Sequence, residues 1–144
     1  MTVSAEDIRT EFRNQVRLRA YEDKYVDRQE EKEIMQVAIS RGCSVDSARS
    51  YLQQVCESSG YVLESSVVRE IKSLLEIQAG NDGRIDRKEF DDALSLARKK
   101  CEGKRTEAQL KKMLCELIED GSFKTTTGWL TSWFNSIKRE VGLL

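Results

Sequence analysis

Histidine and proline are both missing from this chain of 144 residues. Without histidine there is no Ser-His or Cys-His nucleophile pair and no metal site with an imidazole ligand. This absence lowers the expectation of an enzyme, and we predict no catalytic residue. Without proline, long helices are permitted throughout, because proline is the residue that breaks helix interiors.

Paired cysteines and long apolar runs are missing as well. None of the four cysteines forms a C-x-x-C pair, so a zinc ribbon or finger is not expected. We interpret Cys56, Cys101 and Cys115 as reduced core thiols, because they continue apolar helix faces. No apolar run reaches the length of a membrane span, and the N-terminus lacks the basic-then-apolar order of a signal peptide. These features predict a cytoplasmic protein with no membrane partner.

Charge of one dominant sign is also lacking. Charged residues make up 34% of the chain, yet the formal net charge is −1. A nucleic-acid partner is not expected, because such proteins need a net basic surface. Two local groups of basic residues can be interpreted in two ways, as a solvated face paired with nearby acids or as a binding surface for an anionic partner. They are the stripe Arg9, Arg13 and Arg17, and the group 98–100, 104–105 and 111–112.

Apolar residues recur at helical spacing in seven segments, which predicts an all-α protein with little or no sheet. Ser4, Asp27, Ser44, Asp86 and Thr106 are suited to cap helix starts. The connection 21–26 is read as polar, and 61–63 as an apolar segment that tucks under the fold. The predicted helices cover about 4–20, 27–41, 44–59, 65–78, 86–101, 106–118 and 127–142.

An internal repeat is present. Val26-Asp-Arg-Gln-Glu30 matches Ile85-Asp-Arg-Lys-Glu89 in residue type after a shift of 59 positions, although two amphipathic helices can also match by chance. The match predicts a duplicated three-helix unit, about 5–59 and 63–120, followed by a C-terminal helix over about 127–142. Neither half is expected to bury its apolar stripe alone, so we predict one core and a single domain over 1–144.

The stretch 75–90 resembles the second half of an EF-hand loop. Gly83 stands where that family has its turn glycine, and Ile85 where it has the hydrophobic residue that pairs two loops. The resemblance implies that Asp82, Asp86 and Glu89 are ligands of Ca²⁺ or Mg²⁺.

The chain departs from the EF-hand pattern in both copies. Gln78 replaces the first aspartate, and Gly80 offers no side chain for a second acidic ligand. In the first copy, Lys24 replaces the turn glycine and Arg19 replaces the first acid. The resemblance therefore implies weak cation binding or none.

The acidic residues of the two loops also have a structural explanation without a metal. Asp27 with Glu30, and Asp86 with Glu89, suit the reciprocal capping box at a helix start. Asp82 beside a glycine is ordinary turn chemistry. We predict that these acids are caps, with a weak cation site as the alternative.

Residues 63 to 120 also resemble TerB-like bacterial domains, which include tellurite-resistance and DnaJ-like co-chaperone proteins. The pattern is an apolar helix, Asp82-Gly83, Ile85, Glu89 opening the next helix, and a third helix capped by Thr106. The resemblance implies a seven-helix bundle with duplicated helices and a non-enzymatic, partner-binding or regulatory role. The first half departs from the pattern at Lys24.

Aromatic residues gather in the last predicted helix. Trp129, Trp133 and Phe134 either pack in the core or form the surface that binds a partner helix. The sequence predicts a non-catalytic module that interacts with another protein or regulates it. The alternative is a weak Ca²⁺ or Mg²⁺ sensor.

Overall fold

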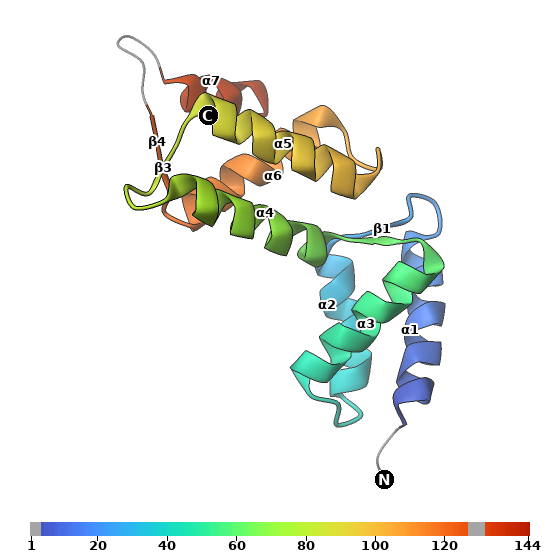
Figure 1. Ribbon diagram of the computed structural model, residues 1–144. Coiled ribbons are helices and arrows are strands. Elements are labelled where there is room, and N and C mark those ends of the chain that lie inside the picture. Colours follow the sequence, from blue (N-terminus) through green and yellow to red (C-terminus); the bar gives the residue numbers. More distant parts are fainter. Residues whose placement is uncertain (1–3, 127–131) are drawn as a thin grey trace. The chain divides into compact units, whose positions relative to one another are not determined.

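The computed structural model describes residues 4–126 and 132–144 (Figure 1). Within them it contains seven helices and four strands of two residues each, which confirms the predicted all-α class. None of the described helices is long and apolar enough to cross a membrane. In chain order the elements are α1 (Ala5–Ala20), β1 (Tyr25–Val26), α2 (Arg28–Ile39), α3 (Val45–Ser59), β2 (Val62–Leu63), α4 (Glu64–Ala79), β3 (Arg84–Ile85), α5 (Arg87–Cys101), α6 (Glu107–Asp120), β4 (Lys124–Thr125) and α7 (Trp133–Glu140).

The chain divides into two compact units, which we call unit 1 (Met1–Ser66) and unit 2 (Val67–Leu144). Each unit is described by itself. The prediction of a single domain with one shared core stays a prediction.

Capping residues set most helix starts where the sequence predicted them. The side chains of Ser4, Asp27, Ser44, Asp86 and Thr106 each accept a bond from a backbone N–H three residues later. These bonds satisfy amide groups that the first helical turn leaves without a partner.

The last helix begins later than predicted. The cap of α7 is Ser132, whose hydroxyl accepts a bond from the backbone N–H of Asn135 at 3.3 Å. The described helix is therefore Trp133–Glu140, shorter than the predicted 127–142, because its capping group lies at 132. Residues 127–131, including Trp129, lie outside the described part of the chain.

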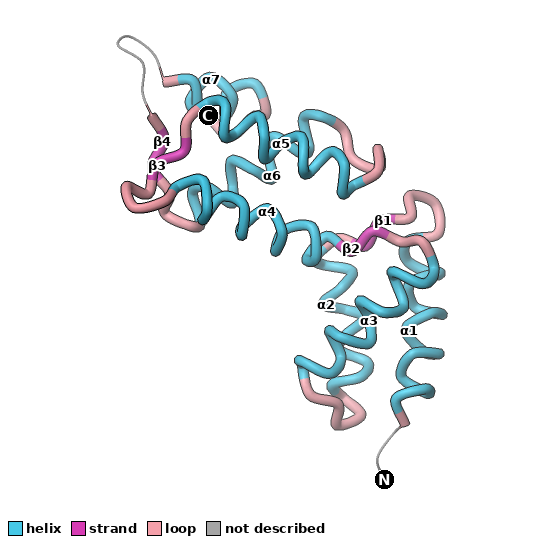
Figure 2. The backbone as a smooth tube through the Cα atoms, in the orientation of Figure 1, coloured by secondary structure: helices cyan, strands magenta, loops and turns pink. Residues whose placement is uncertain are grey.

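Two short parallel strand pairs join segments that are distant in the sequence. β1 pairs with β2, and β3 pairs with β4, as the two magenta segments of each pair show in Figure 2. The predicted polar connection 21–26 is wrong at its end, because Tyr25 and Val26 are fully buried. Pairing with the distant segment 62–63 accounts for this burial.

The repeat is present in the structure as well as in the sequence. A shift of 59 residues converts the bounds of α1 into those of α4, and those of β1 into those of β3. Because α5 is three residues longer than α2, the shift becomes 62 for the caps Ser44 and Thr106 and for the strands β2 and β4. The predicted duplicated three-helix unit, followed by α7, is therefore confirmed.

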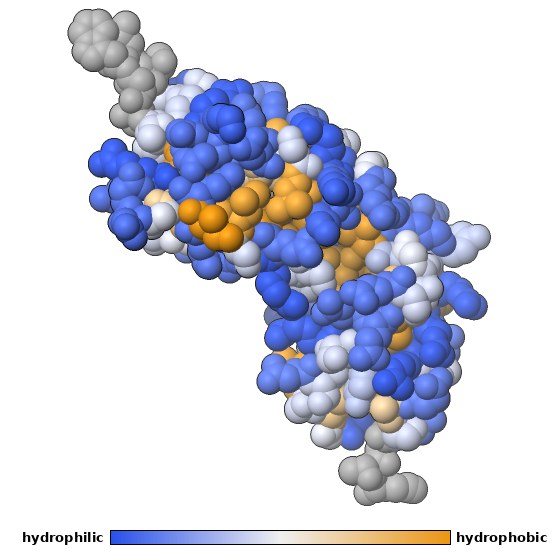
Figure 3. Space-filling view, viewed as in Figure 1, coloured by the Kyte–Doolittle hydropathy of each residue, from blue (hydrophilic) through white to orange (hydrophobic). Residues whose placement is uncertain are grey.

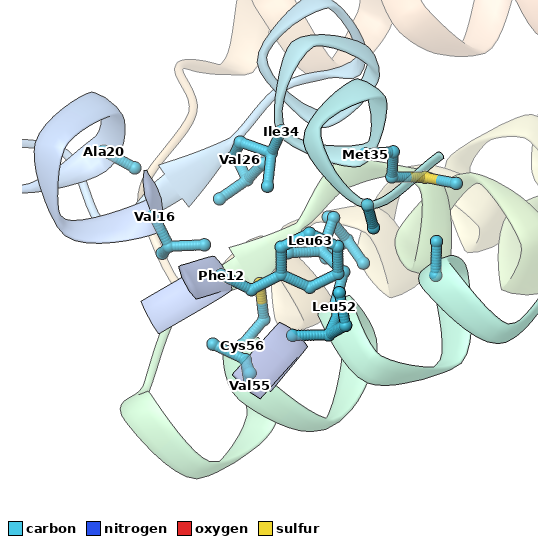
Figure 4. Close-up of a cluster of buried hydrophobic side chains, with 13 residues drawn as sticks. Phe12, Val16, Ala20, Val26, Ile34, Met35, Leu52, Val55, Cys56 and Leu63 are labelled. Atoms are coloured by element: carbon cyan, nitrogen blue, oxygen red, sulfur yellow. The ribbon is translucent and has the colours of Figure 1, made fainter. Parts of the chain in front are cut away.

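Matched positions of the two units are buried in the same way. In unit 1, Phe12 and Leu52 lie in a hydrophobic cluster formed by α1, α2, α3 and the strand pair (Figure 4). This cluster takes all its members from residues 8–63. Buried pairs across the repeat are Ile8 with Val67, Phe12 with Ile71, Val16 with Leu75, Ala20 with Ala79, Val26 with Ile85, Met35 with Leu94, Ala38 with Ala97, Ala48 with Leu110, Leu52 with Leu114 and Cys56 with Ile118.

The first testable prediction concerns the glycine of the second loop. Gly83 has φ +68°, and no heavy atom lies within 4 Å of a Cβ added there. Gly83→Ala is therefore expected to lower the free energy of unfolding by about 1 kcal/mol through backbone strain alone. Chemical denaturation measures this, with the exposed Asn81→Ala as the control. Equal stability of the two variants would contradict the left-handed turn.

Candidate functional site

The acids of the second loop hold backbone amides. Asp86 Oδ1 accepts a bond from the N–H of Glu89 at 2.7 Å, and Glu89 Oε1 accepts one from the N–H of Asp86 at 3.0 Å. Asp82 Oδ1 accepts a bond from the N–H of Arg84 at 2.9 Å. The side chain of Gln78, which stands where an EF-hand has its first acid, donates to the carbonyl of Glu89 at 3.0 Å. The predicted capping box is confirmed here.

The first loop repeats the turn bond and the capping box without a glycine. Asp23 Oδ1 accepts a bond from the N–H of Tyr25 at 3.1 Å, and Asp27 and Glu30 form the second capping box. Lys24 has φ +56°, the left-handed conformation that Gly83 adopts in the other loop. Burial raises the pKa of Glu30, although the bond from the Asp27 N–H lowers it. The two loops therefore share these side-chain-to-backbone bonds and the left-handed residue before the strand, but they differ at their first position, where Tyr21 has φ −58° and Gly80 has φ +54°.

The loop acids are not gathered into a cluster of metal ligands in the described part of the chain. Within residues 4–126 and 132–144, no three carboxylate or thiol side chains are placed to hold a metal ion together. The carboxylates of Asp86 and Glu89 are each directed to a backbone amide of the other residue. Binding of Ca²⁺ or Mg²⁺ at Asp82, Asp86 and Glu89 stays a prediction.

The second testable prediction separates a cap from a metal ligand at Asp86. Asp86→Ala is expected to lower the free energy of unfolding by about 1 kcal/mol, and Asp86→Asn by much less, because asparagine caps helices about as well as aspartate. Both variants lack the carboxylate that a cation would need. Thermal unfolding with and without Ca²⁺ measures the effect. Stabilisation of the wild type by Ca²⁺ that both variants lose would instead identify a cation site.

The basic stripe of α1 is paired with neighbouring groups at two of its three positions. Arg9 and Arg13 lie 3.5 and 3.4 Å from the carboxylate of Glu6. Arg9 also donates to Gln54 at 3.0 Å and lies over the ring of Tyr51. For Arg9 and Arg13 the alternative of a solvated face paired with nearby acids is confirmed.

The second basic group is also paired with acids. Arg98 donates two bonds to Glu107, at 3.1 and 2.5 Å, and this contact lowers the pKa of the Glu107 carboxyl. Lys100 lies 3.2 Å from Glu70, Lys104 lies 2.9 Å from Glu102, and Lys111 lies 2.9 Å from Glu140. The group is therefore a mixed-charge surface.

Three of the four thiols are buried, as predicted, and Cys43 is half-buried. Burial first, and then the charges of Glu31 and Glu57, raise the pKa of Cys56 to about 12. Burial also raises the pKa of Cys115 to about 12, with Glu119 adding to the rise and Lys138 opposing it.

The third testable prediction follows from these thiols. Because their pKa is about 12, the thiolate fraction of Cys56 and Cys115 at pH 8 is expected to be about 1000-fold below that of a thiol with the ordinary pKa. The thiolate is the reactive form, so both thiols should react slowly in the native protein. Titration with a disulfide reagent should label Cys43 in the native protein and the other three only on unfolding. The Cys43→Ser variant is the control. Rapid native labelling of a second thiol in that variant would contradict the burial.

Trp133 and Phe134 of the last helix pack inside unit 2. The ring of Trp133 contacts those of Phe90 and Phe134 edge-on, with centroid distances of 5.5 and 5.7 Å. Its indole N–H donates to the hydroxyl of Thr126 at 3.2 Å, and Phe134 is buried. The structure therefore uses both rings for packing. Partner binding by Trp133 and Phe134 stays a prediction, and Trp129 lies outside the described residues.

An apolar patch lies over α4 in Figure 3, on the helix where Ile77 is 78% exposed. Leu18 is its match across the repeat and is also 78% exposed. Both helices therefore present an exposed apolar residue at the same repeat position.

A groove that the sequence did not predict lies between α2 and α3 of unit 1. It has a volume of about 280 Å³, and the apolar residues along it are Met35, Ile39 and Val45. Glu31 also lines it and is only 7% exposed. The hydroxyl of Ser65 donates to this carboxylate at 2.9 Å. We call this feature the α2/α3 groove.

One sequence signal could have indicated the groove. Glu31 stands at the repeat position that unit 2 fills with Phe90, and both residues are buried. A charge that replaces a core aromatic between matched helices costs free energy of burial and marks a site that packing alone does not explain.

Comparison of the chain with protein-family models, curated proteins and solved structures gives no match. Within the described residues, the α2/α3 groove combines apolar walls with charged groups, and it is the candidate functional site.

Proposed function

We propose that this chain is a non-catalytic, cytoplasmic interaction module that binds a segment of another protein in the α2/α3 groove. The observation that carries the proposal is the groove itself, with three apolar residues in its walls and a buried carboxylate, Glu31, beside them. Its volume of about 280 Å³ is near the lower end for small-molecule sites, and it suits a few inserted side chains.

Further support comes from the chemistry that the groove offers. Its charged residues are one carboxylate and three cations, Arg28, Lys32 and Arg49. Side chains of this kind recognise partners and orient them, whereas general acid–base catalysis most often uses histidine, which the chain lacks. The resemblance of residues 63 to 120 to TerB-like domains also favours a regulatory or partner-binding role.

The test places a charge in the groove at an exposed position. Val45 is 47% exposed at the first position of α3, where the helix dipole favours an acid, so Val45→Glu should fold normally. Leu18→Glu introduces the same charge on another face of unit 1, where Leu18 is 78% exposed.

Affinity capture from native lysate with the full-length chain compares these variants. The proposal expects a protein that both the wild type and Leu18→Glu retain and that Val45→Glu loses, with all three equally folded by circular dichroism. Capture that Val45→Glu leaves unchanged would contradict binding through the groove.

A further inference from the structure

In unit 2, the helix α7 packs against the surface formed by α5 and α6. Its Trp133 ring contacts Phe90 of α5, and its Glu140 carboxylate lies 2.9 Å from Lys111 of α6. Lys138 of α7 lies 3.4 Å from Glu119, near the other end of α6. One short helix therefore contacts both α5 and α6 through an aromatic face and ion pairs.

The surface under α7 is the repeat equivalent of the α2/α3 groove. Phe90 corresponds to Glu31 after the shift of 59, and Lys111 corresponds to Arg49 after the shift of 62. Both unit 1 residues line the groove. After its last strand, unit 2 continues to α7, whereas in unit 1 β2 leads directly into α4. The α2/α3 groove thus corresponds to the surface that α7 covers in unit 2.

The charges of the groove determine which kind of helix would suit it. Arg28, Lys32 and Arg49 line it against one carboxylate, so the surface is net positive. Arg28 and Arg49 lie 3.9 Å from Glu64 and Asp46. Both arginines are exposed, and surface pairs at this distance contribute little free energy, so an incoming acid can replace those partners at little cost.

A second copy of α7 does not match these charges. It carries Lys138 and Arg139 against the single acid Glu140. In the groove its two cations would lie near three others, which is unfavourable for association.

We infer that the α2/α3 groove receives a short amphipathic helix from a partner protein, with acidic residues beside its apolar face. The inference rests on the proposed function. The apolar face of the partner helix lies along Met35, Ile39 and Val45, as the rings of α7 lie against Phe90. Its acids lie against Arg28, Lys32 and Arg49, as Glu140 lies against Lys111.

Selection from a displayed library of random helix-forming peptides tests this with the immobilised full-length chain. Enriched peptides are expected to show apolar residues at helical spacing, flanked by Asp or Glu. Against the double variant Lys32→Glu, Arg49→Glu their affinity should fall by about tenfold or more, because attractive pairs become repulsive. Lys72→Glu, an exposed charge reversal on α4, should leave affinity unchanged.

The remaining outcomes of the selection would overturn the acidic-helix inference alone or together with the proposed binding function of the groove. Enriched peptides that are basic or extended, and that Val45→Glu still abolishes, would overturn the acidic helix and leave the groove as a binding site. Enrichment of no peptide whose binding depends on the groove would overturn both. A dimer in sedimentation velocity that Val45→Glu dissociates would make a second copy the occupant and overturn the inference.

Discussion

Replacing Phe134 with alanine is expected to lower the free energy of unfolding by about 3–5 kcal/mol, the usual effect of removing a buried aromatic ring. Phe134 is 7% exposed, its ring contacts that of Trp133, and the ammonium of Lys138 lies 5.0 Å from its centroid. The loss is large beside a typical total stability of about 5–15 kcal/mol.

The same substitution should also expose the surface under α7. The charge of Lys138 in α7 opposes the rise in the pKa of Cys115, so the helix lies near this thiol, and undocking of the helix is expected to open access to it. Labelling of Cys115 with a disulfide reagent, and denaturation followed by tryptophan fluorescence, measure the two effects. Cys56 in unit 1 should stay protected and serves as the internal control.

Asn135→Ala is the matched control on the same helix, because Asn135 is exposed and only its backbone N–H bonds the cap. It should change stability by less than about 0.5 kcal/mol. If Phe134→Ala left both stability and Cys115 labelling at the level of this control, α7 would not be packed on unit 2. The α2/α3 groove would then have no helix-covered counterpart in unit 2.

The second large effect is expected in the repeated cores. Leu52 and Leu114 occupy the same repeat position, and both are fully buried. Replacing either with alanine should lower the free energy of unfolding by about 3–5 kcal/mol, because each change leaves a cavity among packed side chains. Leu18→Ala, at a position that is 78% exposed, is the control.

Comparing the two leucine variants also tests the predicted single domain. Circular dichroism follows the helices of both units, whereas fluorescence follows Trp129 and Trp133, which both belong to unit 2. With one cooperative domain, each variant should shift a single transition seen equally by both probes. If Leu52→Ala shifted the dichroism and left the fluorescence transition in place, the units would unfold separately and the single-domain prediction would be wrong.

Glu31 is a buried charged residue at a repeat position where the other unit has an aromatic core residue. Its match, Phe90, contacts another aromatic ring, whereas Glu31 keeps a nearly buried carboxylate bonded to Ser65. Burial of a carboxylate costs free energy that an apolar residue avoids. The proposed role of the groove in binding gives a reason for keeping a charge at this position.

The sequence by itself determined the helical class and the starts of five helices. Ser4, Asp27, Ser44, Asp86 and Thr106 cap the helices that the apolar spacing predicts, because both signals act within about four residues of each other. It also determined the repeat and the capping role of Asp86 and Glu89.

Only the tertiary structure decided the features that depend on distant contacts. The two-residue strands are too short to show an alternating pattern, and the burial of Tyr25 depends on pairing with Val62, which lies 37 positions away. The packing of Trp133 against Phe90 and the opening of the α2/α3 groove depend on which helix faces meet. Helical spacing shows that a helix has an apolar face, but the fold decides what covers that face, because the contacts that cover it come from residues far along the chain.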